Sequence, residues 1–222
     1  MNTRRALLVL KAYESISKKI LLLTCTIFLG GTVNAIEEPE YQVISKNQEF
    51  ETRHYSQYLV AEVILDGDFK SSGNQAFRVL AGYIFGDNKA AEKMAMTAPV
   101  ESQMTNSSEK MAMTAPVLSI DGEGKYIYRF VMEKRYKLDT LPTPNDTRIR
   151  LHEVKPRYMA VKRFSGSWSE KNYKESEKAL LQSLSDRNIQ TIGLPIFARY
   201  NAPFVPWFLR RNEIMIEIDR TD

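Results

Sequence analysis

The same succession of strand, turn and helix occurs twice along this chain of 222 residues. This repeat limits the folds that the chain can adopt. A predicted strand at residues 58–65, YLVAEVIL, precedes the turn Gly67-Asp68-Phe69 and a helix, and a second predicted strand at residues 158–164 precedes Gly166-Ser167-Trp168 and a second helix. Strands with one apolar face and helices with one apolar stripe must cover each other. We therefore predict an α+β fold, in which a duplicated strand-strand-helix-strand unit forms a distorted antiparallel β-barrel or sheet flanked by two helices.

Apolar alternation and turn residues set the expected element bounds. Strands are expected at residues 50–55, 58–65, 94–104, 111–120, 126–132, 148–154, 158–164, 197–200 and 213–218. One helix is expected from a cap at Ser71 or Ser72 to about Phe85, and the other from Glu170 to about Arg187.

A second repeat is the octapeptide KMAMTAPV, which stands at residues 93–100 and again at 110–117. Two such strands with a polar connection predict a hairpin, with the methionines of each copy on one face. Methionine thioethers suit Cu(I), so a copper site is a minor hypothesis. Core packing is the stronger interpretation, because methionine commonly fills gaps in cores. The four methionines concerned are Met94, Met96, Met111 and Met113.

The first 35 residues have the composition of a signal peptide. Five of the 31 basic residues and one of the 27 acids precede or flank a short apolar run, which ends at Val33-Asn34-Ala35. We predict a leader at residues 1–35, no permanent membrane anchor, and a domain at residues 36–222 in an exported protein, periplasmic or secreted. That domain is formally neutral and lacks the only cysteine, Cys25, which argues against nucleic-acid binding, disulfides and thiol catalysis.

Few residues carry candidate chemistry, because the common enzyme motifs are absent. His54 and His152 are the only imidazoles, and either is as well explained as an edge or solvated residue. On the first helix, side chains at i, i+3, i+4 and i+7 share one face. They are Asn74, Phe77, Arg78 and Ala81. Phe77 and Ala81 could form the floor of an apolar pocket, and Arg78 could pair with an anion at its rim. The alternative is that the apolar residues belong to the core and that Arg78 is a solvated residue at the side of the helix.

The segments FETRHYSQYLVAEV, GYIFGDN, KMAMTAPV and ARYNAPFVPWFLRRNEIMIEI resemble the SOUL/haem-binding protein family. The resemblance implies a duplicated barrel related to effector-binding domains, and a non-enzymatic, monomeric protein that binds haem or another tetrapyrrole non-covalently. It implies His54, within Arg53-His54-Tyr55, as an axial ligand of the iron. It also implies haem contacts at Asn74, Phe77 and Ala81, although Asn74 and Gly82 stand where relatives have basic residues, so Arg78 is expected to meet the propionates.

Three functions stay open from the sequence. The first is an exported haem or tetrapyrrole binder for buffering or transport. The second is a binder of another small apolar ligand in the same groove. The third is a hydrolase on the related fold, which would need a convergent pair of buried acids.

Overall fold

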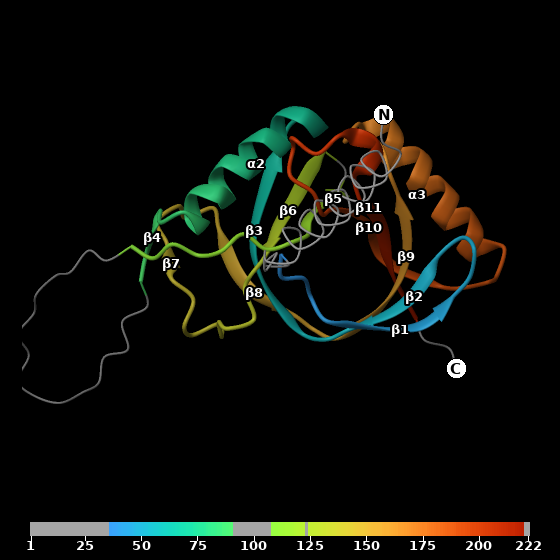
Figure 1. Ribbon diagram of the computed structural model, residues 1–222, viewed down its shortest axis with the longest axis horizontal. Coiled ribbons are helices and arrows are strands. Elements are labelled where there is room, and N and C mark those ends of the chain that lie inside the picture. Colours follow the sequence, from blue (N-terminus) through green and yellow to red (C-terminus); the bar gives the residue numbers. More distant parts are fainter. Residues whose placement is uncertain (1–35, 91–107, 123, 220–222) are drawn as a thin grey trace, which may run out of the picture. The chain divides into compact units, whose positions relative to one another are not determined.

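The computed structural model describes residues 36–90, 108–122 and 124–219 (Figure 1). The predicted leader, the strand expected at residues 94–104 and the first KMAMTAPV copy therefore lie outside the described residues. Within the described part of the chain, no helix combines the length and apolarity needed to cross a membrane.

Two helices and eleven strands follow one another along the described chain. The strands are β1 (Tyr41–Lys46), β2 (Glu51–Tyr55), β3 (Tyr58–Asp66), β4 (Asn88–Lys89), β5 (Val117–Gly122), β6 (Lys125–Val131), β7 (Thr143–Pro144), β8 (Arg150–Val154), β9 (Arg157–Phe164), β10 (Thr191–Arg199) and β11 (Asn212–Ile218). The helices are α2 (Phe69–Ile84) and α3 (Glu170–Ser185), with a short 3-10 turn, η1, at Trp207–Leu209.

The predicted α+β fold and its duplication are confirmed, and the sheet shows how the two repeats combine. Nine antiparallel strands run in the order β1-β2-β9-β11-β10-β5-β6-β3-β8, an open, curled half-barrel (Figure 1). Outward from the β10–β5 junction, the order β10-β11-β9 of one repeat mirrors β5-β6-β3 of the other. The first strand of each repeat is exchanged, since β2 pairs with β9 and β8 pairs with β3.

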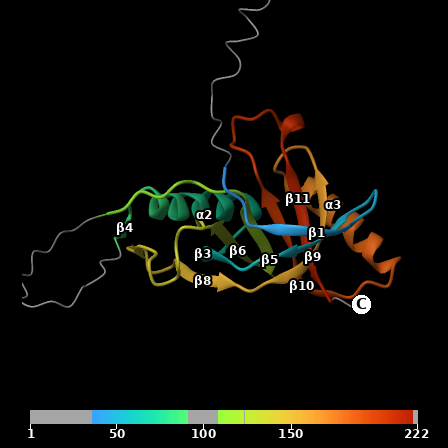
Figure 2. The same cartoon turned by 60° about the horizontal axis from the view of Figure 1, so that its bottom comes forward.

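Both helices lie on the same face of this sheet. Phe197, Ser119 and Tyr128 are direct cross-strand neighbours, so their side chains share a face. Phe197 belongs to the apolar cluster under α3, and Tyr128 belongs to the cluster under α2. Figure 1 and Figure 2 both show α2 and α3 on opposite sides of β5 and β10. A third cluster, which contains Ile120 and Ile196, fills the other face.

Two expected features of the first repeat are corrected. The cap of α2 is Asp68, whose carboxylate accepts from the backbone N–H groups of Lys70 and Ser71, so the prediction of Ser71 or Ser72 is wrong. The strand expected at residues 111–120 begins only at Val117. The preceding segment makes no ladder, because its backbone bonds go elsewhere: Met111 N–H donates to Ile84 O at 2.8 Å and Ala115 N–H to Glu37 O at 2.9 Å.

Candidate functional site

A cleft of about 950 Å³ lies on the face of the sheet that carries the helices. Val117 and Arg199, which are paired across the β5–β10 junction, lie at its floor. The side chains that form its walls come from α2, from the start of α3 and from the connection after β10. The cleft therefore sits where the two repeats meet, a position that neither repeat can form alone.

Aromatic and apolar side chains make up most of this lining. They come from both repeats: Phe69 and Phe77 from α2, Met113, Ala115 and Val117 from the second KMAMTAPV copy, Trp168 before α3, and Tyr200, Ala202 and Pro203 after β10. Phe77 is 45% exposed, and its ring lies edge-on to Phe130 at 5.8 Å. A cleft of this size and lining is typical of sites for small organic ligands, which span about 300–1,000 Å³.

The cleft floor also holds a guanidinium, that of Arg199, for which the described residues provide no carboxylate. Its Nε is buried and has no hydrogen-bond partner there. Three rings surround the group instead, with Arg199 Cζ 4.9 Å from the Phe197 ring centroid and 5.6 Å from those of Phe69 and Trp168. Burial lowers the pKa of Arg199 below its ordinary value, because desolvation disfavours the charged form.

The other charged groups of the lining lie at its edge. Lys70 and Arg78 are exposed on α2 and form no ion pair within the described chain. The acids are Asp68 and Glu170, both exposed at helix N-termini. The hydrogen bonds that Asp68 accepts within the α2 cap lower its pKa, first of all the one from the Ser71 hydroxyl. The two acids are not a buried pair, so the described lining offers no general acid–base constellation.

Only three of the four residues predicted to share one face of α2 lie in the cleft. Asn74, Phe77 and Arg78 all line the cleft. Ala81, one turn further on, is 7% exposed and belongs to the core cluster under α2. Met111 belongs to the same cluster and hydrogen-bonds to the end of α2, so the chain that runs beside the helix closes the face at this point.

His54 lies apart from the residues that line the cleft. It is half-buried on β2, and its ring lies 4.5 Å from the ring of Tyr158 on β9. Its role as an axial ligand stays a prediction. His152, on β8, has Nε2 3.7 Å from Glu62 Oε2. Burial lowers the pKa of His152 and Arg129 lowers it further, against the opposing effect of Glu62.

A buried ion network supports the cleft wall from behind. Tyr200 lines the cleft, and its hydroxyl donates to Glu213 at 2.8 Å. Glu213 is fully buried and also accepts from Arg53 at 2.9 and 3.2 Å and from Arg211 at 3.0 Å. Burial alone would lower the pKa of Arg53, but Glu213 raises it well above the ordinary arginine value. Residues from both ends of the domain thus fix the position of Tyr200.

The described residues give little support to a copper site. Met94 and Met96 lie outside them. Met111 is 5% exposed in the core under α2, whereas Met113 lines the cleft. Residues 36–90, 108–122 and 124–219 contain no group of three or more His, Cys, Asp or Glu side chains placed to hold a metal ion.

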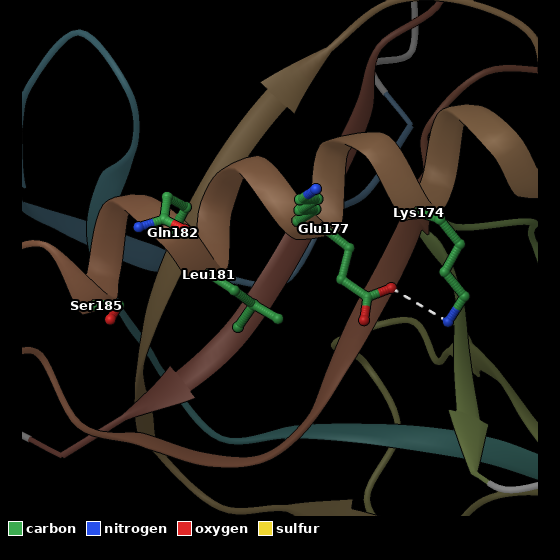
Figure 3. Close-up of a pocket in the computed structure, with 6 residues that line it drawn as sticks. Lys174, Glu177, Leu181, Gln182 and Ser185 are labelled. Carbon is green, nitrogen blue, oxygen red and sulfur yellow. Dashed lines mark ion pairs between the residues drawn. The ribbon is translucent and has the colours of Figure 1, made fainter.

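A second hollow, of about 470 Å³, lies along α3 and is lined by that helix alone (Figure 3). Two lysines line it: Lys178 is exposed, and Lys174 is paired, since its Nζ lies 3.4 Å from Glu177 and 3.1 Å from Asp121. Leu181 supplies its apolar surface. This hollow lacks the aromatic walls and the unpaired buried cation of the cleft, so the cleft is the better candidate site.

Fold and cleft together define a duplicated α+β half-barrel with its site between two helices. The family model described as SOUL heme-binding protein matches residues 36–217. The chain therefore belongs to the SOUL heme-binding protein family, as its segments indicated. That family is a haem-binding family rather than a class of enzymes. A search of curated proteins gives no significant match.

Solved structures with a similar fold include EcmrR and its C-terminal domain. The EcmrR C-terminal domain has a TM-score of 0.53 at 9% identity, over 81% of this chain and 98% of that chain. EcmrR in a complex with DNA has a TM-score of 0.55 at 11% identity, over 98% of this chain and 70% of that chain. An uncharacterized conserved protein from Listeria innocua has a TM-score of 0.51 at 9% identity, over 79% of this chain and 94% of that chain. At these identities the likeness concerns the fold alone.

Proposed function

We propose that this protein binds haem or a related tetrapyrrole non-covalently in the cleft between α2 and α3. The observation that carries the proposal is the cleft itself, about 950 Å³ with aromatic walls from both repeats, in a chain of the SOUL family. Burial of a planar apolar macrocycle against Phe69, Phe77 and Trp168 would supply the main free energy of binding. Binding, without turnover, is the activity that these groups support.

The lining fits the organic part of haem better than its iron. No histidine is among the described lining residues, and the Tyr200 hydroxyl is already engaged with Glu213. Met113 is the one thioether among those residues. Bound haem would supply only a Lewis-acidic iron, whereas the chain supplies apolar contacts and cations for the propionates. Such a site suits buffering or transport.

The test is a titration of residues 36–222 with hemin, followed at the Soret band. This piece is suitable because the sheet, both helices and the three core clusters lie within it. We expect a saturable shift. Asn74→Trp, which fills the cleft from α2, should weaken binding at least tenfold, whereas Lys171→Trp, on the exposed surface of α3, should not.

His54→Ala distinguishes the two sites that the family resemblance suggests. A ligand in the cleft gives a Soret shift that this variant leaves unchanged, because His54 does not line the cleft. A shift that His54→Ala abolishes and Asn74→Trp does not would reject the cleft. The absence of any saturable shift would reject tetrapyrrole binding.

Export is part of the proposal and is supported by the composition of residues 1–35. The protein would then act outside the cytoplasm as a monomer without a permanent anchor. Mass spectrometry of the expressed full chain tests this. Recovery from the exported fraction as a species that begins near Ile36 is expected, and full-length protein in the cytoplasmic fraction would contradict it.

A further inference from the structure

The floor of the cleft contains a charge whose partner is missing from the described chain. Arg199 is held on the same face of β10 as the core residue Phe197, beneath the aromatic walls. Its Nε is buried and donates to no acceptor among the described residues. A buried charge without a counter-ion is costly, and buried cations in proteins are normally paired.

We propose that Arg199 is an anion subsite at the base of the cleft, which takes the carboxylate of an amphipathic ligand. The apolar body of that ligand would then lie against Phe69, Phe77 and Trp168, towards the mouth. This inference rests on the proposed function in sharing its cleft, and it goes further by naming the group that is recognised. The protein would recognise the acid group and the apolar body of the ligand, so the ligand need not contain iron.

Three features of the surroundings favour an anion at this point. The rings of Phe69, Trp168 and Phe197 hold the guanidinium in place but leave its hydrogen-bonding capacity unused. The N-terminal ends of α2 and α3 both border the cleft, and helix N-termini carry positive potential. The described lining has three cations, Lys70, Arg78 and Arg199, against the two acids already placed at its edge.

The carboxylate could lie at the edge of the cleft, beside Arg78, or at its floor, beside Arg199. Arg78 is exposed at the edge of α2, whereas Arg199 is half-buried at the floor and its Nε is fully buried. A charge-assisted hydrogen bond is stronger in the poorly solvated interior than at an exposed rim. The acid group is therefore assigned to Arg199, and Arg78 is left to contribute a weaker, salt-sensitive attraction.

The experiment compares matched acid and neutral ligands on residues 36–222. One pair is metal-free protoporphyrin and its dimethyl ester, and the other is dodecanoate and dodecanol, all measured by calorimetry or fluorescence. The variants are Arg199→Met, Arg78→Met and, as a control on exposed β8, Arg150→Met. We expect the wild type to bind each acid at least tenfold more tightly than its neutral partner. Arg199→Met should reduce this ratio to about one, and the two other variants should retain most of it.

Each outcome decides the proposal. The subsite is overturned if Arg199→Met keeps the preference for the acid over the neutral ligand. It is also overturned if Arg78→Met removes that preference instead. A purely structural Arg199 predicts that Arg199→Met lowers the melting temperature and weakens acid and neutral ligands equally. The subsite predicts an unchanged or higher melting temperature without ligand. If dodecanoate binds in an Arg199-dependent way and protoporphyrin does not bind, the subsite is supported and the tetrapyrrole proposal fails. If neither acid binds more tightly than its neutral partner, the subsite fails.

Discussion

Replacing Glu213 by glutamine removes the charge that neutralises Arg53 in the interior of the domain. Glu213 is 0% exposed and Arg53 is 4% exposed, and their closest N–O distance is 2.9 Å. Breaking a buried ion pair by neutralising one partner costs about 3–5 kcal/mol, because the remaining charge stays buried. Glu51, at 2.7 Å from Arg53 and 20% exposed, compensates in part, so the lower half of that range is expected. Domains of this size unfold with about 5–15 kcal/mol, so the loss is large.

The assay is urea denaturation of residues 36–222, followed by far-UV circular dichroism. Glu38→Gln is the control, because Glu38 pairs with Arg211 at a half-exposed position and its loss should cost about 1 kcal/mol or less. The double variant Arg53→Met/Glu213→Gln should recover part of the loss, since it removes the Arg53 guanidinium that the single variant leaves without its buried partner. A loss below about 1 kcal/mol for Glu213→Gln, or additive effects in the double variant, would refute the reasoning.

Two further predictions concern residues outside this network. The pKa of His152 is lowered below 6.5 in the folded protein, so its stabilising contribution is present above about pH 6.5 and is lost as the pH falls through the folded value. The unfolding free energy should therefore decrease as the pH falls below about 6.5, less steeply in His152→Gln than in the wild type. Identical slopes in the two proteins would contradict this. Gly73 lies within α2, and an added Cβ would meet Tyr128 Oη at 3.5 Å, an ordinary contact. Gly73→Ala should therefore stabilise the domain by about 0.5–1 kcal/mol in the same denaturation assay, and a destabilisation would show that the helix cannot accept the methyl group.

Most elements could be predicted from apolar runs, helical periodicity and the turn residues between them. The strand at residues 58–65 is a nearly continuous apolar run that is buried on both faces, and the helix from Glu170 follows the helical period; both were found within a few residues. β1 was missed, since nearly all its side chains are exposed and it is held only by its ladder to β2. The segment before Val117 shows the reverse case: it has an apolar pattern but is not a strand. Its apolar residues are buried through contacts with α2 and with the chain near Glu37.

The candidate site was predictable only on α2. Helical spacing placed Asn74, Phe77 and Arg78 on one face, which the cleft uses, but it could not show that the neighbouring chain covers Ala81. Arg199 was missed, although its position two residues after the core residue Phe197 signals a charge on a buried strand face.

The long-range relations needed the structure. Arg53 and Glu213 are 160 residues apart and meet only because β2 is exchanged onto the second repeat. The floor of the cleft likewise joins the second KMAMTAPV copy to the end of β10. A single sequence shows which residues are unusual for their position, but it does not show which of them meet.

The most direct test of ligand binding between α2 and α3 uses the two tryptophans of the chain. Trp168 lines the cleft, whereas Trp207 lies in η1 and is 61% exposed. In Trp207→Phe, the remaining fluorescence within residues 36–222 reports on the cleft wall. Hemin should quench it saturably and nearly completely, at the same midpoint as the Soret shift. A saturable Soret shift without quenching of Trp168 would place the ligand elsewhere and contradict the account.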